Sequence, residues 1–119
     1  MELSFKKKNK TIIIMVSGEI DHHTSKELRR QTESAYLDMG VRNIIFHFEK
    51  VTFMDSSGIG MLIGRYKQLQ SIGGRISVVA ANEKITEIIQ FSGLSKLIPL
   101  FETIEDAFSY TEGREHHAV

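Results

Sequence analysis

The sequence predicts an α/β protein in which a mostly parallel sheet is opened by one antiparallel hairpin. Short apolar runs typical of strands alternate with stretches whose apolar residues recur at helical spacing. A helix between two strands favours parallel pairing, because a parallel connection needs a crossover of about a dozen or more residues. A chain of 119 residues holds one core, so we expect a single domain over residues 1–119. It should contain about four or five strands and about four helices.

The chain begins with two expected strands, at residues 3–6 and 11–17, joined by a hairpin turn at residues 8–10. The second strand is apolar at every position from 12 to 16. Such a run is typical of a strand that is covered on both faces. We therefore expect this strand in the interior of the sheet.

The first helix is expected over residues 24–39. Thr24 and Glu27 match a capping box, in which the threonine hydroxyl accepts a bond from a first-turn amide and the glutamate reaches back. Gly40 follows as a left-handed C-terminal cap. The helix thus has both a start and a stop signal.

The rest of the chain continues the alternation of strand and helix. The expected elements are a strand at 43–48, a helix with apolar residues spaced over 59–69, a strand at 76–80, a helix capped by Asn82 and ended near Gly93, a short extended piece at 98–100, a last helix capped by Thr103, and a frayed tail over 112–119.

Composition excludes several classes of function. The 15 basic and 15 acidic residues balance, so nothing favours nucleic acid or an anionic membrane as a partner. The chain has no cysteine, which excludes disulfides, thiolate metal sites and cysteine nucleophiles. The apolar run at 12–16 is too short to span a membrane, and the N-terminus lacks the apolar segment of a signal peptide. We expect a cytoplasmic protein that is a monomer when free.

The most informative segment is residues 51–60, Val-Thr-Phe-Met-Asp-Ser-Ser-Gly-Ile-Gly, which leads into the second helix. Its Asp and Ser side chains can cap that helix, and each such cap stabilises by about 1 kcal/mol. Gly58, Gly60 and Gly64 can let the helix approach the sheet closely. The same helix start can also accommodate a phosphate, because free amides and the positive end of the helix dipole lie there. The residues by themselves leave both interpretations open.

A phosphate on Ser57 would place about −1.5 to −2 charges at the surface without unfolding the domain. Asp55, and Asp21 at the end of the second strand, would add to this negative patch. The pattern therefore suggests a switch that acts by disrupting an interface.

Four segments of the chain resemble the STAS-domain family of bacterial anti-sigma factor antagonists, and among them the sporulation stage II group. The resemblance covers nearly the whole chain. Its carriers are residues 16–21 (Val-Ser-Gly-Glu-Ile-Asp), residues 51–60, residues 64–67 (Gly-Arg-Tyr-Lys) and residues 92–94 (Ser-Gly-Leu).

The resemblance implies that Ser57 is phosphorylated by a partner that is both an anti-sigma factor and a serine kinase. The unphosphorylated chain would bind this partner and so release the sigma factor, and a serine phosphatase would restore it. ATP would belong to the kinase, since this chain has no Gly-rich phosphate loop. The chain would then be no enzyme and need no cofactor or metal. The implied docking surface consists of Asp21, Asp55, Ser56, Ser57, Gly58 and Ile59.

Two enzyme interpretations compete with the switch. Asp21-His22-His23 is similar to a triplet of metal-dependent phosphoesterases, but further ligands from other strands would be needed. Ser57 with His47 could form a hydrolase pair, although no Gly-x-Ser-x-Gly elbow is present. We expect the two adjacent histidines to be exposed in a turn, and His47 to be a strand residue.

A third interpretation is a ligand- or stress-sensing STAS module in a larger signalling assembly. Phe91, Phe101 and Phe108 could line a lipid or nucleotide site in such a module. We expect these side chains to lie in the core instead.

Overall fold

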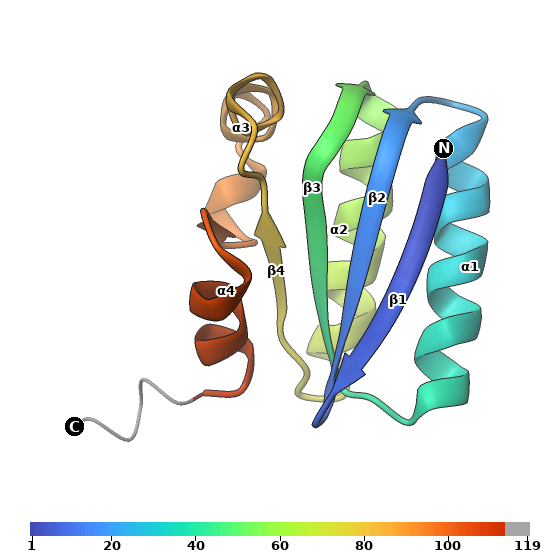
Figure 1. Ribbon diagram of the computed structural model, residues 1–119, viewed down its shortest axis with the longest axis vertical. Coiled ribbons are helices and arrows are strands. Elements are labelled where there is room, and N and C mark those ends of the chain that lie inside the picture. Colours follow the sequence, from blue (N-terminus) through green and yellow to red (C-terminus); the bar gives the residue numbers. More distant parts are fainter. Residues whose placement is uncertain (114–119) are drawn as a thin grey trace.

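Five strands form one mixed sheet in the order β1-β2-β3-β4-β5 (Figure 1). The computed structural model describes residues 1–113; residues 114–119 lie outside the described part. The elements are β1 (Glu2–Lys8), β2 (Thr11–Ile20), α1 (Thr24–Met39), β3 (Asn43–Met54), α2 (Ser56–Gln70), β4 (Ile76–Val79), α3 (Glu83–Phe91), the 3-10 helix η1 (Leu94–Lys96), β5 (Leu100–Phe101) and α4 (Ile104–Thr111). Only the pair β1–β2 is antiparallel. The predicted fold class is confirmed.

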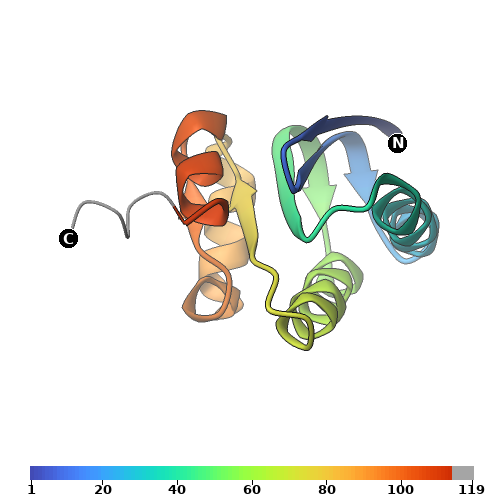
Figure 2. The same cartoon turned by 90° about the horizontal axis from the view of Figure 1, so that it is seen from below.

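The helices form two unequal layers on the sheet. From β2 to β5 each new strand is added on the same side of the one before it, so right-handed crossovers place α1, α2 and α3 on one face. Helix α4 lies on the opposite face, against β3, β4 and β5 (Figure 2). Ile12 and Ile14 of β2 belong to the core cluster of the three-helix layer, whereas Ile13 packs with Phe108 of α4.

Strand β2 is covered on both faces only where α4 reaches it. Ile13 is buried beneath α4, but Met15, two residues on along the same face, is 41% exposed. The sequence predicted a fully covered strand here, and that prediction is wrong at Met15. A run of apolar residues does not reveal where a short covering helix stops.

Strands β2 and β3 are both longer than predicted. Residues 51–54, expected between a strand and a helix, form the end of β3 and pair with β2, so that Ile20 lies opposite Met54. Two register shifts, between Met15 and Ser17 and between Gly18 and Glu19, interrupt the pairing. Such irregularities break the simple alternation of apolar and polar residues, which hid the strand ends from the sequence pattern.

The expected helix caps are confirmed except at α1. The side chains of Asn82 and Thr103 accept from the amides three residues on, at 3.3 and 3.1 Å. Gly40 ends α1 with φ of 62°. The capping box is wrong, because the Thr24 hydroxyl bonds to the preceding turn and the Glu27 carboxylate accepts from side chains further along α1.

The two edges of the sheet are β1 and β5. Strand β1 ends in three lysines, Lys6, Lys7 and Lys8, and β5 has only two residues. Glu112, the first residue of the predicted frayed tail, instead accepts a hydrogen bond from the Thr11 hydroxyl. The rest of that predicted tail, residues 114–119, lies outside the described part.

Candidate functional site

The predicted site residues come from two neighbouring strand ends. Ile20 and Met54 are paired at the ends of β2 and β3, and the Asp55 amide donates to the Ile20 carbonyl at 3.3 Å. The chain then turns after Ile20 at Asp21 and after Met54 into α2. Parallel pairing therefore brings the Asp21 turn and the start of α2 to the same end of the sheet.

Asp55 is the N-cap of α2. Its backbone is extended, with φ of −114°, and its Oδ1 accepts from the Ser57 amide at 2.8 Å. The predicted capping role of Asp55 is confirmed. This bond occupies the backbone amide of Ser57 and leaves its hydroxyl without a hydrogen bond within residues 1–113.

Asp21 organises the start of α1 in the same way. Its Oδ1 accepts from the amides of His23 and Thr24, both at 2.9 Å. The hydrogen bond from the Thr24 amide is the main reason that the pKa of the Asp21 carboxyl is lowered from its ordinary value. Asp21 is therefore a fixed negative charge at this end of the sheet, and it takes the capping role that the sequence assigned to Thr24.

Gly58 is buried and faces the sheet. A Cβ atom there would lie 2.7 Å from Cγ of Met54 and 3.0 Å from Cγ2 of Ile20. This confirms that Gly58 lets α2 approach the strands. Gly60 and Gly64 differ, because a Cβ at either position would meet nothing within 4 Å.

Ser56 and Ser57 line two different grooves on either side of α2. The apolar groove, between α2 and α3, has a volume of about 540 Å³. The basic groove, between α1 and α2, has a volume of about 230 Å³. The apolar groove contains Ser56, Ile59, Ile88 and Phe91 with Asp55, and the basic groove contains Ser57, Lys26, Arg29 and Arg65 with Gly60 and Gly64.

The burial of Phe91 was predicted wrongly from the sequence. Phe91 was expected in the core, but its side chain is 95% exposed at the end of α3. Phe108 of α4 is buried and Phe101 is half-buried beside Tyr110, so the three phenylalanines do not share one site. An exposed phenylalanine beside half-buried Ile88 is typical of an interaction surface. Apolar periodicity could not have told it from a core residue.

The enzyme interpretations gain no support from the geometry. His22 and His23 are exposed, as expected, with their ring centres 5.7 Å apart. Within residues 1–113 no group of three or more Asp, Glu or His side chains could hold a metal ion. Asp21-His22-His23 is therefore a turn and not part of a metal cluster.

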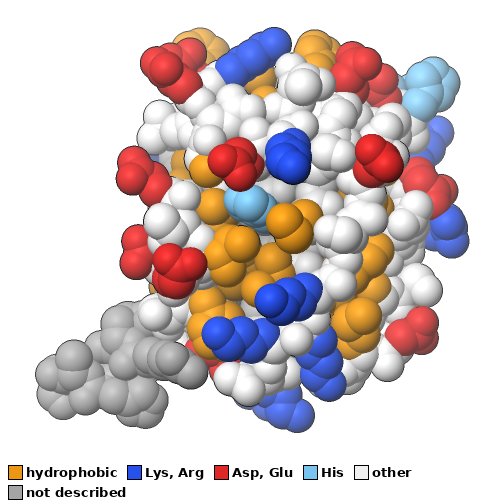
Figure 3. Space-filling model, in the orientation of Figure 1, with side chains coloured by type: hydrophobic (Ala, Val, Ile, Leu, Met, Phe, Trp, Pro, Cys, Tyr) orange, Lys and Arg blue, Asp and Glu red, His pale blue; other side chains and the backbone are white. Residues whose placement is uncertain are grey.

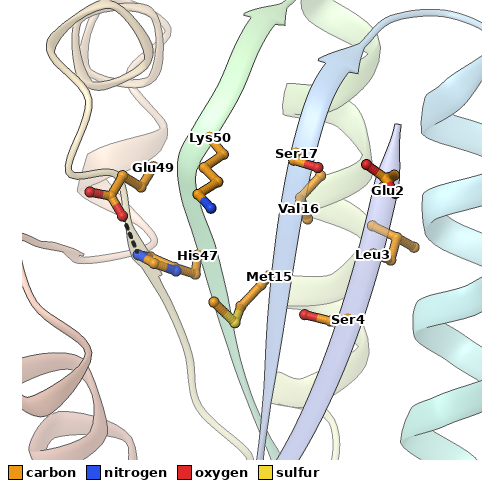
Figure 4. A pocket seen from close by; sticks show the side chains of 9 residues that line it. All are labelled: Glu2, Leu3, Ser4, Met15, Val16, Ser17, His47, Glu49 and Lys50. Carbon is orange, nitrogen blue, oxygen red and sulfur yellow. Dashed lines mark ion pairs between the residues drawn. The ribbon is translucent and has the colours of Figure 1, made fainter.

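His47 lies on the open face of the sheet, away from Ser57. It faces a cavity of about 420 Å³ with Met15, and its Nε2 is 3.8 Å from the Glu49 carboxylate (Figure 4). On the face of the molecule shown in Figure 3, hydrophobic side chains gather in one patch and charged side chains border it. Helix α2 covers the opposite face, so the structure does not bring Ser57 and His47 together.

The comparisons with known proteins agree with this arrangement. The family model described as "STAS domain" matches residues 2–107. The chain belongs to the STAS-domain family. The anti-sigma F factor antagonist of Paenibacillus polymyxa is 35% identical over 101 residues, which are 85% of this chain and 86% of that protein.

Two solved structures extend the likeness. The unphosphorylated form of the anti-sigma factor antagonist SpoIIAA is 31% identical with a TM-score of 0.78, over 94% of this chain and 97% of that one. The phosphorylated form of the Bacillus cell fate determinant SpoIIAA is 31% identical with a TM-score of 0.69, over 92% and 98%. No helix within residues 1–113 of this STAS domain is long and apolar enough to cross a membrane.

Proposed function

We propose that this STAS domain is an anti-sigma factor antagonist whose binding is switched off by phosphorylation of Ser57. The observation that carries the proposal is the half-buried Ser57 hydroxyl, which makes no hydrogen bond within residues 1–113. It projects from the first turn of a helix whose start is fixed by the Asp55 cap. A kinase can therefore reach the hydroxyl without opening the fold, and the phosphate is accommodated by the helix N-terminus.

The partner that phosphorylates Ser57 is an anti-sigma factor with serine kinase activity, and it supplies ATP. The Ser57 oxygen forms a bond to the γ-phosphorus, and the bond from that phosphorus to the bridging oxygen breaks. ADP leaves, and a base of the kinase takes the hydroxyl proton. A serine phosphatase reverses the change with water. This chain contributes only the acceptor, so it needs no cofactor or metal and is not itself an enzyme.

The surface that the partner covers consists of the apolar groove and the adjoining start of α2, where Ser57 lies. Ile59, Ile88 and Phe91 lie in the groove, and Asp55 and Ser56 line its edge beside α2. Large apolar side chains at the centre of an interface usually carry most of the binding free energy. Gly58 supports this surface from below, and Asp21 lies at the same end of the sheet.

One phosphate is enough for the switch. Like charges forced together at an interface cost several kcal/mol, and moving a partner from mostly bound to mostly free takes about 5.5 kcal/mol. The unphosphorylated chain binds the anti-sigma factor and releases the sigma factor, and the phosphorylated chain does not bind. Relatives described as anti-sigma F factor antagonists support the antagonist role. We propose that this role serves sporulation transcription in the cytoplasm.

The first experiment incubates the chain with the cognate anti-sigma kinase and ATP and maps the phosphate by mass spectrometry. We expect one phosphate, on Ser57, and none on Ser57→Ala. Ser56→Ala is the matched control, because its hydroxyl is adjacent and also makes no hydrogen bond within residues 1–113. A phosphate on Ser56 of the unmodified chain would overturn the site assignment.

The second experiment measures binding to the kinase by calorimetry. Ser57→Ala should bind with an affinity close to that of the unmodified chain. Ser57→Asp should bind at least about tenfold more weakly, because it places a charge at the interface. Equal affinities of these two variants would contradict a switch based on charge.

A further inference from the structure

The basic groove contains three cations and no carboxylate among its lining residues. Lys26 and Arg29 project from α1, and Arg65 projects from α2. Ser57 lines the same groove at the start of α2. Gly60 and Gly64 leave its floor open, because a side chain at either position would enter empty space. The groove is therefore shaped and charged to receive an anion.

One neighbouring carboxylate balances only part of this charge. Glu33 lies 2.9 Å from Nη2 of Arg65 and 3.7 Å from Nε of Arg29. Lys26 has no ion-pair partner within residues 1–113. Three cations and one carboxylate leave about two positive charges, which matches the charge of a phosphoserine near neutral pH.

Arg65 has one unsatisfied nitrogen at the far end of the groove, while its Nε donates to Gln68 and its Nη2 pairs with Glu33. It is 7% exposed, and its Nη1 is buried with no hydrogen-bond partner in the described residues. Burial lowers the pKa of the Arg65 guanidinium, and Glu33 opposes that effect. Leaving a buried charged donor unpaired costs free energy, so the groove favours an added negative charge.

The packing of α1 on α2 aligns the cations with Ser57. The ion pair of Arg65 with Glu33 places these residues side by side. Ser57 precedes Arg65 by two helical turns, and Ser25 precedes Glu33 by the same number. Lys26 and Arg29 therefore lie beside the first turns of α2, within reach of a group on Ser57. Arg65 lies about 12 Å along the axis, so it acts on that group through its field and not by contact.

We infer that the phosphate on Ser57 is held by its own chain, in the basic groove, by Lys26 and Arg29. The inference rests on the phosphorylation of Ser57 proposed above. Asp21 and Asp55 lie at the strand ends and do not line the basic groove. The phosphorylated form thus has a defined arrangement, in which two cations of α1 hold the phosphate in one position at the start of α2.

The test uses the full chain with phosphoserine installed at residue 57 during synthesis, so that it does not depend on any kinase. Phosphorus NMR gives the second pKa of the phosphate. Nearby cations stabilise the dianion and lower this pKa. Lys26→Gln and Arg29→Gln should each raise it by about 0.5, and the double variant should raise it further. Circular dichroism checks that each variant is folded, which we expect because both residues are exposed.

Lys67→Gln is the matched control, since Lys67 is an exposed cation of α2 that lies outside the groove. In this variant the second pKa of the phosphate on Ser57 should equal that of the phosphoprotein without the Lys67 change. The inference is overturned if the double variant leaves the pKa unchanged, or if Lys67→Gln raises it as much as Arg29→Gln does. Failure of the kinase to phosphorylate Ser57 would instead contradict the proposed function and leave this result standing.

Discussion

The two sides of the first turn of α2 differ in chemistry although they begin at consecutive serines. Ser56 lines the apolar groove toward α3, where Phe91 is exposed, and Ser57 lines the basic groove toward α1, where Lys26 and Arg29 lie. Successive residues of a helix point about 100° apart, so adjacent positions can face different neighbours. The difference teaches that one helical turn can present an apolar surface for docking on one side and a modifiable serine beside cations on the other.

The largest expected effect tests the close contact between α2 and the sheet at Gly58. Gly58→Ala should lower the free energy of unfolding by about 1–3 kcal/mol, because the new methyl group would overlap Met54 and Ile20. Gly60→Ala is the matched control and should raise it by about 0.5–1 kcal/mol, since its methyl group meets nothing. Urea unfolding measures both. Equal effects of the two changes would show that α2 does not press on the strands at Gly58.

The next effect tests the apolar side. Phe91→Ala should weaken binding of the anti-sigma kinase by about tenfold, because a large apolar contact is lost. Its melting temperature should stay the same, since Phe91 is 95% exposed. Leu37→Ala on α1 is the control: Leu37 is 74% exposed but lies outside both grooves. Loss of binding in Leu37→Ala alone would move the docking surface to α1.

The smallest effect concerns the Asp21 carboxylate, which lies at the end of the sheet where α2 starts. The pKa of Asp21 is lower in the folded chain than in the unfolded one, so its ionised form stabilises the fold. This contribution is fully present above the unfolded pKa and is lost as the pH falls through the folded pKa. Asp21→Asn should therefore be less stable than the unmodified chain at pH 6, and the difference should shrink toward pH 3. Urea unfolding at the two pH values measures it, and a difference that does not depend on pH would contradict the assigned hydrogen bonds.

Most of the fold could be predicted because its helices and strands follow regular patterns of apolar residues and capping residues. Helical spacing in α2 and caps at Asn82 and Thr103 are local signals, and the structure confirms them. The ends of β2 and β3 and the α1 cap were not predicted. The strand ends depend on pairing between distant segments. At the start of α1, Asp21 accepts from the Thr24 amide, and the Thr24 hydroxyl bonds back to Asp21 and Glu19 instead of capping the helix.

The site was predicted only in part, for a similar reason. Asp55 and Gly58 act within one turn of α2, so their roles as cap and close contact were readable from the segment itself. The grooves combine α2 with α1 and with α3, and no local pattern joins Ser57 to Arg29 or Ser56 to Phe91. The docking surface itself stays a prediction for all six of its residues: Asp21, Asp55, Ser56, Ser57, Gly58 and Ile59.

The two edges of the sheet also bear on how the chain behaves at high concentration. An exposed edge strand offers unpaired amides and carbonyls to other molecules, which can lead to aggregation. Here one edge, β1, ends in three lysines, and the other, β5, is two residues long. Charge repulsion discourages strand addition at the first edge, and the second offers too little backbone to pair. We therefore expect the chain to remain a single copy at high concentration, so that a partner meets a surface that no second copy covers.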